Sequence, residues 1–174
     1  QVDAVILEDY GKGLLTQELL DQILDRAREA GKIIAVDPNP NNPLNWQGAT
    51  VVKPNRSEAW QAAGFPPTAD QPIEFIGERL LDTWRVDNIL MTLGEDGLIL
   101  FQPPEPPFHT PTRAREVFDV SGAGDTVIAF FTAALAAGLS KPDAALIANH
   151  AAGIVVGKLG TATVTPTELR QSFE

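Results

Sequence analysis

Residues 119–126 read Asp-Val-Ser-Gly-Ala-Gly-Asp-Thr, and an apolar run of small residues, Val127–Gly138, follows without a break. The small residues 122–124 permit a tight turn that gathers backbone N–H groups at the predicted start of a helix, which is how proteins build a cradle for an anion. Asp125 in the same turn would lie within reach of the bound anion, and a carboxylate beside a phosphate site is suited to act as a general base. The stretch therefore predicts phosphoryl transfer.

The composition predicts a globular protein and argues against several other classes. Of the 174 residues 44% are hydrophobic, enough to bury a core in one domain or in two small ones. The formal net charge is −10 and Lys and Arg are scattered, which argues against a nucleic-acid or anionic-membrane partner. Without cysteine the chain has no disulfide, thiol nucleophile or thiolate metal site. The longest apolar run, residues 127–139, is too short to span a bilayer, so we expect a soluble, cytoplasmic protein.

The first third of the chain predicts a strand, a helix and a second strand. Val2–Leu7 is a short apolar run that ends at an acidic pair, and ligands favour that edge of a sheet. Thr16 can cap a helix whose apolar spacing continues until Gly31. Ile33–Val36 predicts the second strand, which should run parallel to the first because a helix connects the two. Thr50–Val52 predicts a third short strand.

The rest of the chain alternates between helices and strands in the same way. Asn55 or Ser57 can cap a short helix, and glycines 94 and 97 bound a turn that joins a strand pair. Residues 103–111 contain five prolines, so we expect a connecting loop there and neither a helix nor a central strand. We expect a short helix that ends at about Ala63, three helices over residues 73–85, 124–137 and 142–156, and a last helix that begins at Thr165. The expected strand pair spans residues 88–92 and 98–101.

The stretch 119–126 is similar to the C-terminal signature of the ribokinase-like (PfkB) carbohydrate kinases. Taken alone, its Gly-Ala-Gly-Asp could be a helix entry in which the glycines only permit close packing. The resemblance implies an α/β fold with a doubly wound, mostly parallel sheet and helices on both faces. It also implies that Asp125 deprotonates a sugar hydroxyl, while the backbone N–H groups of Gly122, Ala123 and Gly124 form an anion hole for the phosphoryl group transferred from ATP.

Asn55-Arg-Ser-Glu58 follows a predicted strand and has two readings. Its spacing suits a helix cap, which needs no ligand. The segment also resembles the Asn-x-x-Glu motif of the family, which acts around magnesium and the phosphates. That resemblance implies that Asn55 and Glu58 bind the Mg²⁺–ATP complex, with Glu58 contacting the ion through water.

Two further positions are candidates for the nucleotide. Thr92-Leu-Gly-Glu-Asp-Gly97 could be only a hairpin turn, yet it resembles the nucleotide-binding turn of the family, which implies that Thr92, Gly94 and Gly97 lie against ATP. Asn149 matches a family position near the adenine, and the alternative is an amide on a helix surface.

The loop before the glycine turn resembles a segment that orders a monovalent cation in many relatives. That resemblance implies a K⁺ site at Asp119 and Ser121, and serine here replaces the more usual threonine while keeping the hydroxyl group.

Asp9-Tyr-Gly-Lys-Gly13 resembles the heptose-phosphate kinase branch of the family. The resemblance implies that Lys12 contacts a phosphate of the substrate or of ATP, a role suited to a flexible point charge. The segment 37–40, Asp-Pro-Asn-Pro, departs from that branch and resembles fructokinase-like relatives instead, which leaves the acceptor open between these sugars.

The resemblance runs from Val2 to about Pro166 and corresponds to the C-terminal part of the family's catalytic domain. We therefore expect residues 1–174 to be the ATP-binding and catalytic part of a ribokinase-like kinase domain. The N-terminal part, the lid and any nucleotidyltransferase domain would lie outside it, and an exposed sheet edge would favour a homodimer. The expected activity is ATP-dependent phosphorylation of a sugar or sugar phosphate, first of all a heptose 7-phosphate. The alternatives are a kinase for fructose, ribose or another sugar, and a nucleotide-binding fragment without turnover.

Overall fold

The computed structural model describes residues 2–114 and 117–174, and within them the strands form a six-stranded sheet in the order β1-β2-β3-β4-β5-β6. The strands are β1 (Ala4–Glu8), β2 (Ile33–Asp37), β3 (Val51–Val52), β4 (Ile89–Thr92), β5 (Leu98–Gln102) and β6 (Glu105–Thr110). The strands from β1 to β4 pair in parallel, whereas β5 pairs antiparallel with both β4 and β6. The expected mostly parallel α/β sheet is confirmed.

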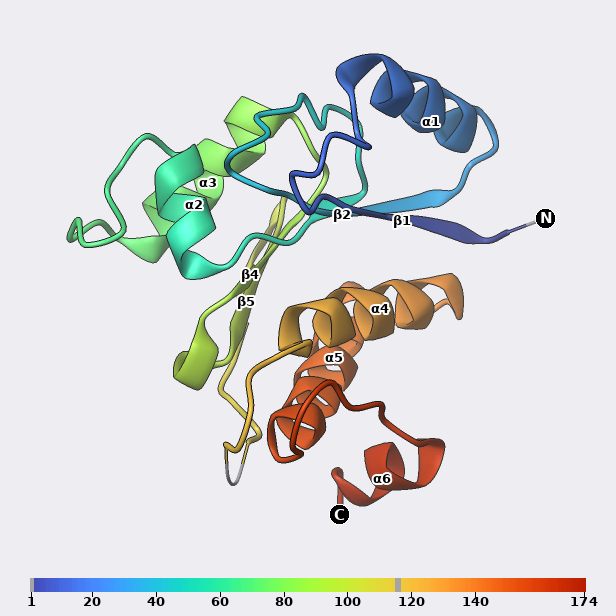
Figure 1. Cartoon of the computed structure of the whole chain (residues 1–174), viewed down its shortest axis with the longest axis vertical. Coiled ribbons are helices and arrows are strands. Elements are labelled where there is room, and N and C mark those ends of the chain that lie inside the picture. Colours follow the sequence, from blue (N-terminus) through green and yellow to red (C-terminus); the bar gives the residue numbers. More distant parts are fainter. Residues whose placement is uncertain (1, 115–116) are drawn as a thin grey trace.

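Helices cover both faces of this sheet, as the sequence predicted (Figure 1). The helices are α1 (Gln17–Glu29), α2 (Arg56–Ala62), α3 (Ile73–Trp84), the 3₁₀ turn η1 (Gly94–Asp96), α4 (Ala123–Ala136), α5 (Lys141–Val156) and α6 (Pro166–Gln171). Helices α1, α2 and α3 pack on one face around one hydrophobic cluster, and α4 and α5 pack on the other face around a second. Thr16 caps α1 by accepting a hydrogen bond from the N–H of Leu19, as its sequence position predicted.

The strands divide their side chains between the two clusters by simple alternation. In β2, Ile34 and Val36 belong to the cluster under α1–α3, and Ala35 belongs to the cluster under α4 and α5. The same alternation places Met91 of β4 on the first face and Leu90 on the second. Because both faces are covered, the strands are apolar on both sides, which is why they read as continuous apolar runs in the sequence.

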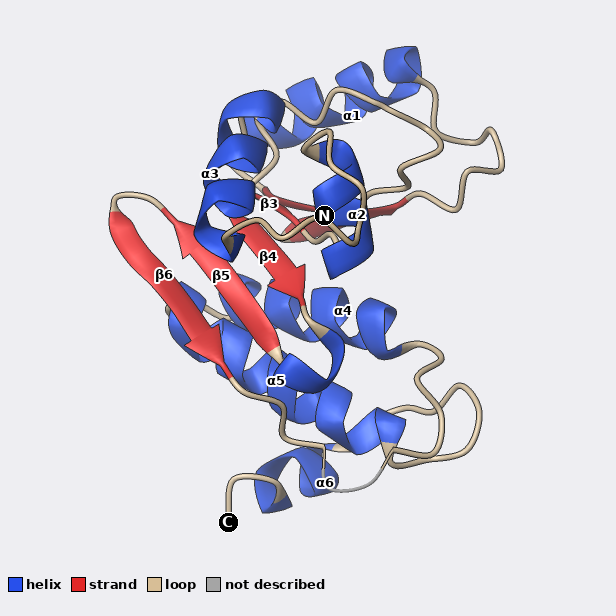
Figure 2. Cartoon of the chain, turned by 90° about the vertical axis from the view of Figure 1, so that its left-hand side faces the viewer, coloured by secondary structure: helices blue, strands red, loops and turns tan. Residues whose placement is uncertain are grey.

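The expected connecting loop at residues 103–111 is wrong, because Glu105–Thr110 forms β6 (Figure 2). This strand lies at the edge of the sheet and, within the part of the chain that the structure describes, pairs with β5 alone. Its pairing shifts register between Leu100 and Gln102, and Pro106 and Pro107 fall at that irregularity. An edge strand with a bulge tolerates proline, since N–H groups there need not enter a ladder. The prolines thus exclude a central strand but not a strand.

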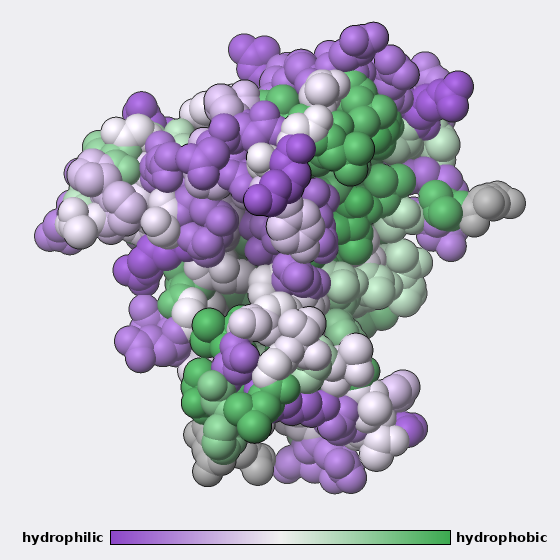
Figure 3. Space-filling view, in the orientation of Figure 1, coloured by the Kyte–Doolittle hydropathy of each residue, from purple (hydrophilic) through white to green (hydrophobic). Residues whose placement is uncertain are grey.

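The opposite edge of the sheet is β1, which pairs with β2 alone among the described residues. Apolar surface gathers beside this edge in Figure 3, and Ile6 of β1 is exposed. Unpaired strand edges can pair with a second chain, and the homodimer expected from such an edge stays a prediction. Across the described ranges, every helix is too short or too polar to cross a membrane.

Candidate active site

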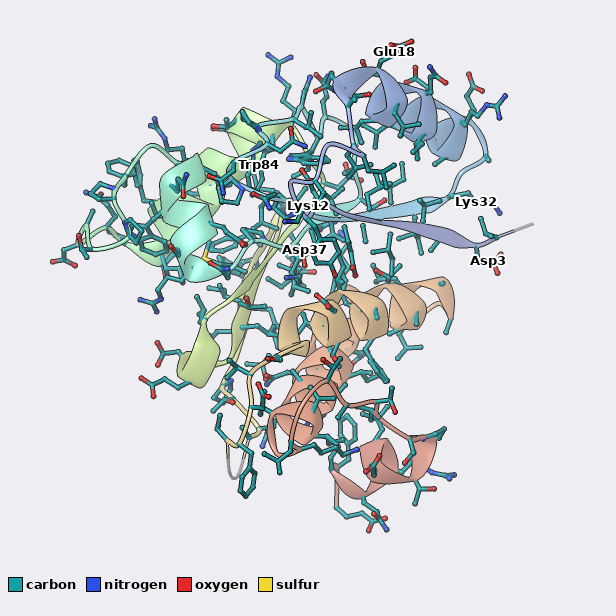
Figure 4. The ribbon with its side chains drawn as sticks, in the orientation of Figure 1. Asp3, Lys12, Glu18, Lys32, Asp37 and Trp84 are labelled. Atoms are coloured by element: carbon teal, nitrogen blue, oxygen red, sulfur yellow. The ribbon has the colours of Figure 1, made fainter. Side chains whose placement is uncertain are left out.

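Polar side chains gather where the carboxyl ends of the parallel strands meet the start of α4. Asp37 ends β2, Lys53 follows β3 directly, and Thr92 ends β4. Figure 4 places Asp37 and Lys12 near the centre of the molecule in this view, whereas Asp3, Glu18 and Lys32 lie at its periphery. Ligands of open α/β sheets bind at this edge, so the structure brings the predicted site to the expected side of the sheet.

The first of two neighbouring cavities at this edge, here called the polar compartment, has a volume of about 570 Å³. Its walls are Asp37, Lys53, Asn55, Arg56, Ser57, Glu58, Thr92, Leu93, Gly94, Val120 and Gly124. The segment 55–58, the turn after β4 and the glycine turn of α4 therefore come together, although they are far apart in the sequence. An isolated bridge between Asn55 and Thr92 fixes the first two segments side by side.

The second cavity, the apolar compartment, has a volume of about 530 Å³ and shares Thr92, Gly94, Val120 and Gly124 with the first. Its other walls are Glu95, Gly97, Leu98, Thr112, Ala114, Val117, Ala123, Val127, Asn149, Ala152, Gly153 and Val156. A mostly apolar slot that opens into a charged compartment suits a ligand with a flat base at one end and phosphates at the other.

Asn149 lines the apolar compartment and is 4% exposed, so the alternative of an amide on the helix surface is wrong. Its Nδ2 donates to Thr110 Oγ1 at 3.0 Å and to the carbonyl oxygen of Pro111 at 2.6 Å. Asn149 therefore fastens the end of β6 to α5 and at the same time forms part of the slot wall. A contact with a base stays a prediction.

The glycine turn starts α4 with the geometry that an anion cradle needs. Gly122 is the N-cap and has a left-handed backbone with φ 77°, a conformation that disfavours other residues. The N–H of Ala123 already donates to the carbonyl oxygen of Val120 at 3.2 Å. The N–H groups of Gly124 and Asp125 belong to the first helical turn, which has no intrahelical acceptors for them. These two N–H groups are thus better placed to donate to an anion than the N–H of Ala123, although the sequence analysis had assigned that group to the anion hole.

Asp125 lies in the first turn of α4 and faces the loop that follows β1. The Tyr10 hydroxyl lies 3.0 Å from Glu8 Oε2 and 3.5 Å from Asp125 Oδ2. The pKa of Tyr10 is raised to about 12, mainly by its hydrogen bond with Glu8 and secondly by the negative charge of Asp125. The single phenolic proton is shared between the two carboxylates, and the contact with Asp125 is the longer and weaker of the two.

The most buried charge of the site, that of Lys53, belongs to an ion pair that the sequence reasoning did not single out. Lys53 is 3% exposed, and its Nζ lies 3.0 Å from Asp37 Oδ2. Burial raises the pKa of Asp37 to about 6, against the opposing attraction of Lys53. A signal was present, because Lys53 directly follows an apolar strand at the edge where ligands bind.

The pKa of Asp37 predicts a pH-dependent difference in stability. A carboxyl whose pKa is higher in the folded protein than the 3.8 of the unfolded chain stabilises the fold below about pH 4, and this contribution disappears as the pH rises through about 6. The change is worth about 3 kcal/mol. In urea unfolding, wild type should therefore lose about that much stability relative to Asp37→Asn between pH 3 and pH 8. The groups acting on Asp37 are Lys53, Glu58 and Glu8. A difference that stays constant across this range would contradict the prediction.

Asn55 and Glu58 form a complete capping box at the start of α2. Asn55 Oδ1 accepts from the N–H of Glu58 at 3.0 Å, and Glu58 Oε2 accepts from the N–H of Asn55 at 2.8 Å. The box uses one polar atom of each side chain, so capping and ligand binding are compatible at these residues. The described residues contain no group of three or more acidic or histidine side chains that could hold a metal ion. The carboxylates of Glu58 and Asp37 line the polar compartment, and oxygen ligands of this kind fit Mg²⁺ when phosphate oxygens complete its shell.

Five predicted site residues line neither compartment, namely Lys12, Asp119, Ser121, Gly122 and Asp125, and the last two flank the lining residues Ala123 and Gly124. Lys12 is exposed in the loop after β1. Asp119 Oδ1 accepts from the N–H of Ser121 at 2.9 Å and Oδ2 accepts from the N–H of Gly160 at 3.2 Å, and the bonds with Ser121 lead the effects that lower the pKa of Asp119. Asp119 therefore ties the loop before α4 to the segment after α5. A cation at Asp119 and Ser121 stays a prediction.

The sheet order, the helices on both faces and the helix start at the carboxyl edge define an α/β protein of the ribokinase-like fold. The ribokinase of Arabidopsis thaliana, solved with ribose and ATP, superposes with a TM-score of 0.82 at 22% identity, covering 99% of this chain and 56% of that one. Phosphofructokinase-2 of Escherichia coli, solved with potassium, gives a TM-score of 0.78 at 18% identity, covering 91% of this chain and 52% of that one.

The chain belongs to the pfkB family of carbohydrate kinases, whose profile matches residues 1–168. Curated relatives include the bifunctional protein HldE of Desulfatibacillum aliphaticivorans, 47% identical over 174 residues, and that of Cronobacter sakazakii, 44% identical over 172 residues. These matches cover 100% and 99% of this chain, and the chain spans 36% of the length of each relative. The family membership expected from the sequence is confirmed.

Proposed function

We propose that this chain supplies the ATP-binding and phosphoryl-transferring part of a carbohydrate kinase. The observation that carries the proposal is that the first turn of α4, which bears Asp125, reaches both the charged compartment and the adjoining apolar slot through Gly124. Phosphoryl transfer depends mainly on positioning and charge stabilisation, and these elements provide both. Because ATP is the donor, we place the reaction in the cytoplasm.

Each compartment takes one part of the nucleotide in this proposal. The adenine occupies the apolar compartment against Asn149, and the ribose and phosphates pass Thr92, Gly94 and Gly97 toward the polar compartment. The terminal phosphate meets the N–H groups at the start of α4, where the helix dipole favours negative charge. Mg²⁺, held by phosphate oxygens and Glu58, would neutralise phosphate charge, and K⁺ at Asp119 and Ser121 would order the loop before α4.

Asp125 accepts the proton of the acceptor hydroxyl, and the acceptor lies between α4 and the loop after β1. We propose a heptose 7-phosphate as acceptor, supported by the similarity to HldE proteins and to the heptose-kinase segment 9–13. Lys12 on that loop would contact the sugar phosphate. A comparison of heptose 7-phosphate, fructose and ribose as acceptors in the complete gene product tests this choice, and a preference for either free sugar would overturn it.

Calorimetric titration of this chain with a non-hydrolysable ATP analogue and Mg²⁺ tests the nucleotide site. We expect wild type to bind, and Asn55→Ser to bind about 10-fold or more weakly, because serine keeps the cap but cannot place an amide in the compartment. Thr165→Ala is the matched control, since it breaks the equivalent capping box of α6. That variant should lose about 1 kcal/mol of stability and keep its affinity. A wild-type chain that does not bind the analogue would contradict the proposal.

A further inference from the structure

Lys53 is held rigidly beside the start of α4, at the inner wall of the polar compartment. Its side chain is 4% exposed. Its backbone N–H donates to the carbonyl oxygen of Val36 at 2.8 Å, which fixes the end of β3 against β2. A Cβ atom built on Gly124 would lie 3.1 Å from Lys53 Nζ. The ammonium group therefore lies against the same helical turn whose N–H groups form the anion cradle.

This position is unfavourable for a lysine, even with Asp37 as its ion-pair partner. The start of a helix carries a partial positive charge and repels a cation, and a buried ion pair seldom contributes net stability. The raised pKa of Asp37 has the same cause, because its burial outweighs the attraction of Lys53. A contribution to the stability of the fold therefore does not explain the Lys53–Asp37 ion pair. A dianionic phosphoryl group between Lys53 and the first turn of α4 would compensate both positive charges at once.

Among the residues that the structure describes, the other cations near the cleft, Arg56 and Lys12, do not occupy such a position. Arg56 at the rim of the polar compartment pairs with Asp96 at 3.1 Å, and both side chains are half exposed or more. Lys12 lies on an exposed loop outside the compartment. Exposed charges are screened by water and salt, whereas a buried charge acts at nearly full strength on a neighbouring ligand.

We infer that Lys53 is a catalytic residue that contacts the terminal phosphate of ATP and stabilises the phosphoryl group during transfer, with Asp37 as its positioning residue. This inference rests on the proposed kinase function. In the transfer, the acceptor oxygen bonds to the γ-phosphorus as the bond from phosphorus to the bridging oxygen of ADP breaks. The hydroxyl proton passes to Asp125, ADP leaves, and Lys53 remains an ammonium group throughout. Its charge acts most strongly where negative charge gathers on the transferred group.

Binding titrations with adenosine, ADP and the non-hydrolysable ATP analogue AMP-PNP test the inference, because the three ligands differ in the number of phosphate groups that they carry. For Lys53→Met we expect AMP-PNP to bind about 10- to 100-fold more weakly, the range for a lost hydrogen bond to a charged group. ADP should lose less, and adenosine should bind as it does to wild type. Lys158→Met is the matched control, because Lys158 is also a paired lysine, with Glu168, but lies outside both compartments.

A second variant guards against an effect of the unpaired Asp37 carboxylate on folding. Asp37→Asn combined with Lys53→Met leaves no unpaired charge, and it should show the same selective loss of AMP-PNP binding. Equal losses for adenosine and AMP-PNP, or an AMP-PNP affinity within about threefold of wild type, would overturn the inference while the nucleotide site stands. A wild-type chain that binds neither nucleotide would instead overturn the proposed function.

Discussion

Replacement of Asp125 by asparagine is expected to slow phosphoryl transfer by about 10²- to 10⁴-fold, the usual contribution of a general base. The amide keeps the size of the side chain and cannot accept the proton of the acceptor hydroxyl. Asp125 is exposed in the first turn of α4, so the substitution should cost the fold only a few tenths of a kcal/mol. Steady-state kinetics of the complete gene product with ATP and the sugar acceptor measures the effect, which should appear in kcat.

Tyr10→Phe is the matched control for this experiment, because the Tyr10 hydroxyl contacts the carboxylate at 3.5 Å without taking its place. We expect this variant to lose far less than Asp125→Asn, about 10-fold or less, as befits the loss of one weak hydrogen bond. Nucleotide affinity should stay unchanged in both variants. An Asp125→Asn enzyme that keeps more than a tenth of the wild-type kcat would exclude Asp125 as the base.

The largest expected effect on stability comes from Gly97→Ala in the turn between β4 and β5. Gly97 has φ 89° and ψ −127°, and a Cβ atom there would lie 2.2 Å from the carbonyl oxygen of Thr110. The substitution therefore combines a strained backbone with a clash against backbone atoms at the end of β6. We expect a loss of about 4 kcal/mol in the free energy of unfolding, measured by urea denaturation.

Gly94→Ala in the same turn separates the clash from the backbone strain. Gly94 also has a positive φ, 63°, but a Cβ atom there meets nothing within 4 Å. This variant should lose only about 1 kcal/mol, the cost of the left-handed conformation alone. Equal losses in the two variants would show that contact with the end of β6 does not set the requirement for glycine at position 97.

Local signals in the sequence were sufficient for most elements and for much of the candidate site. The cap at Thr16 and the apolar spacing after it predicted α1, and the glycine turn predicted the start of α4 within one residue. The position of Asp125 followed from the same turn. These features depend on neighbours in the chain, and a sequence displays such neighbours directly.

What escaped prediction depends on residues that are distant in the chain. The prolines at 106 and 107 indicated a loop, and only pairing with β5 makes the segment an edge strand. Lys53 was not singled out, because its ion pair with Asp37 and its place against α4 arise only in the fold. Asn149 was ambiguous because its partners, Thr110 and Pro111, are more than thirty residues away.

The strictly sequential strand order bears on how the chain folds as it leaves the ribosome. Each new strand emerges beside its neighbour in the sequence, so each pairing can form as soon as that strand is made. Helices α4 and α5, however, are synthesised after the whole sheet and return to cover its second face, as far back as β1. Until they appear, apolar side chains such as Ala35, Leu90 and Leu100 face water. The nascent chain just before α4 is therefore the stage at which aggregation and chaperone binding are expected.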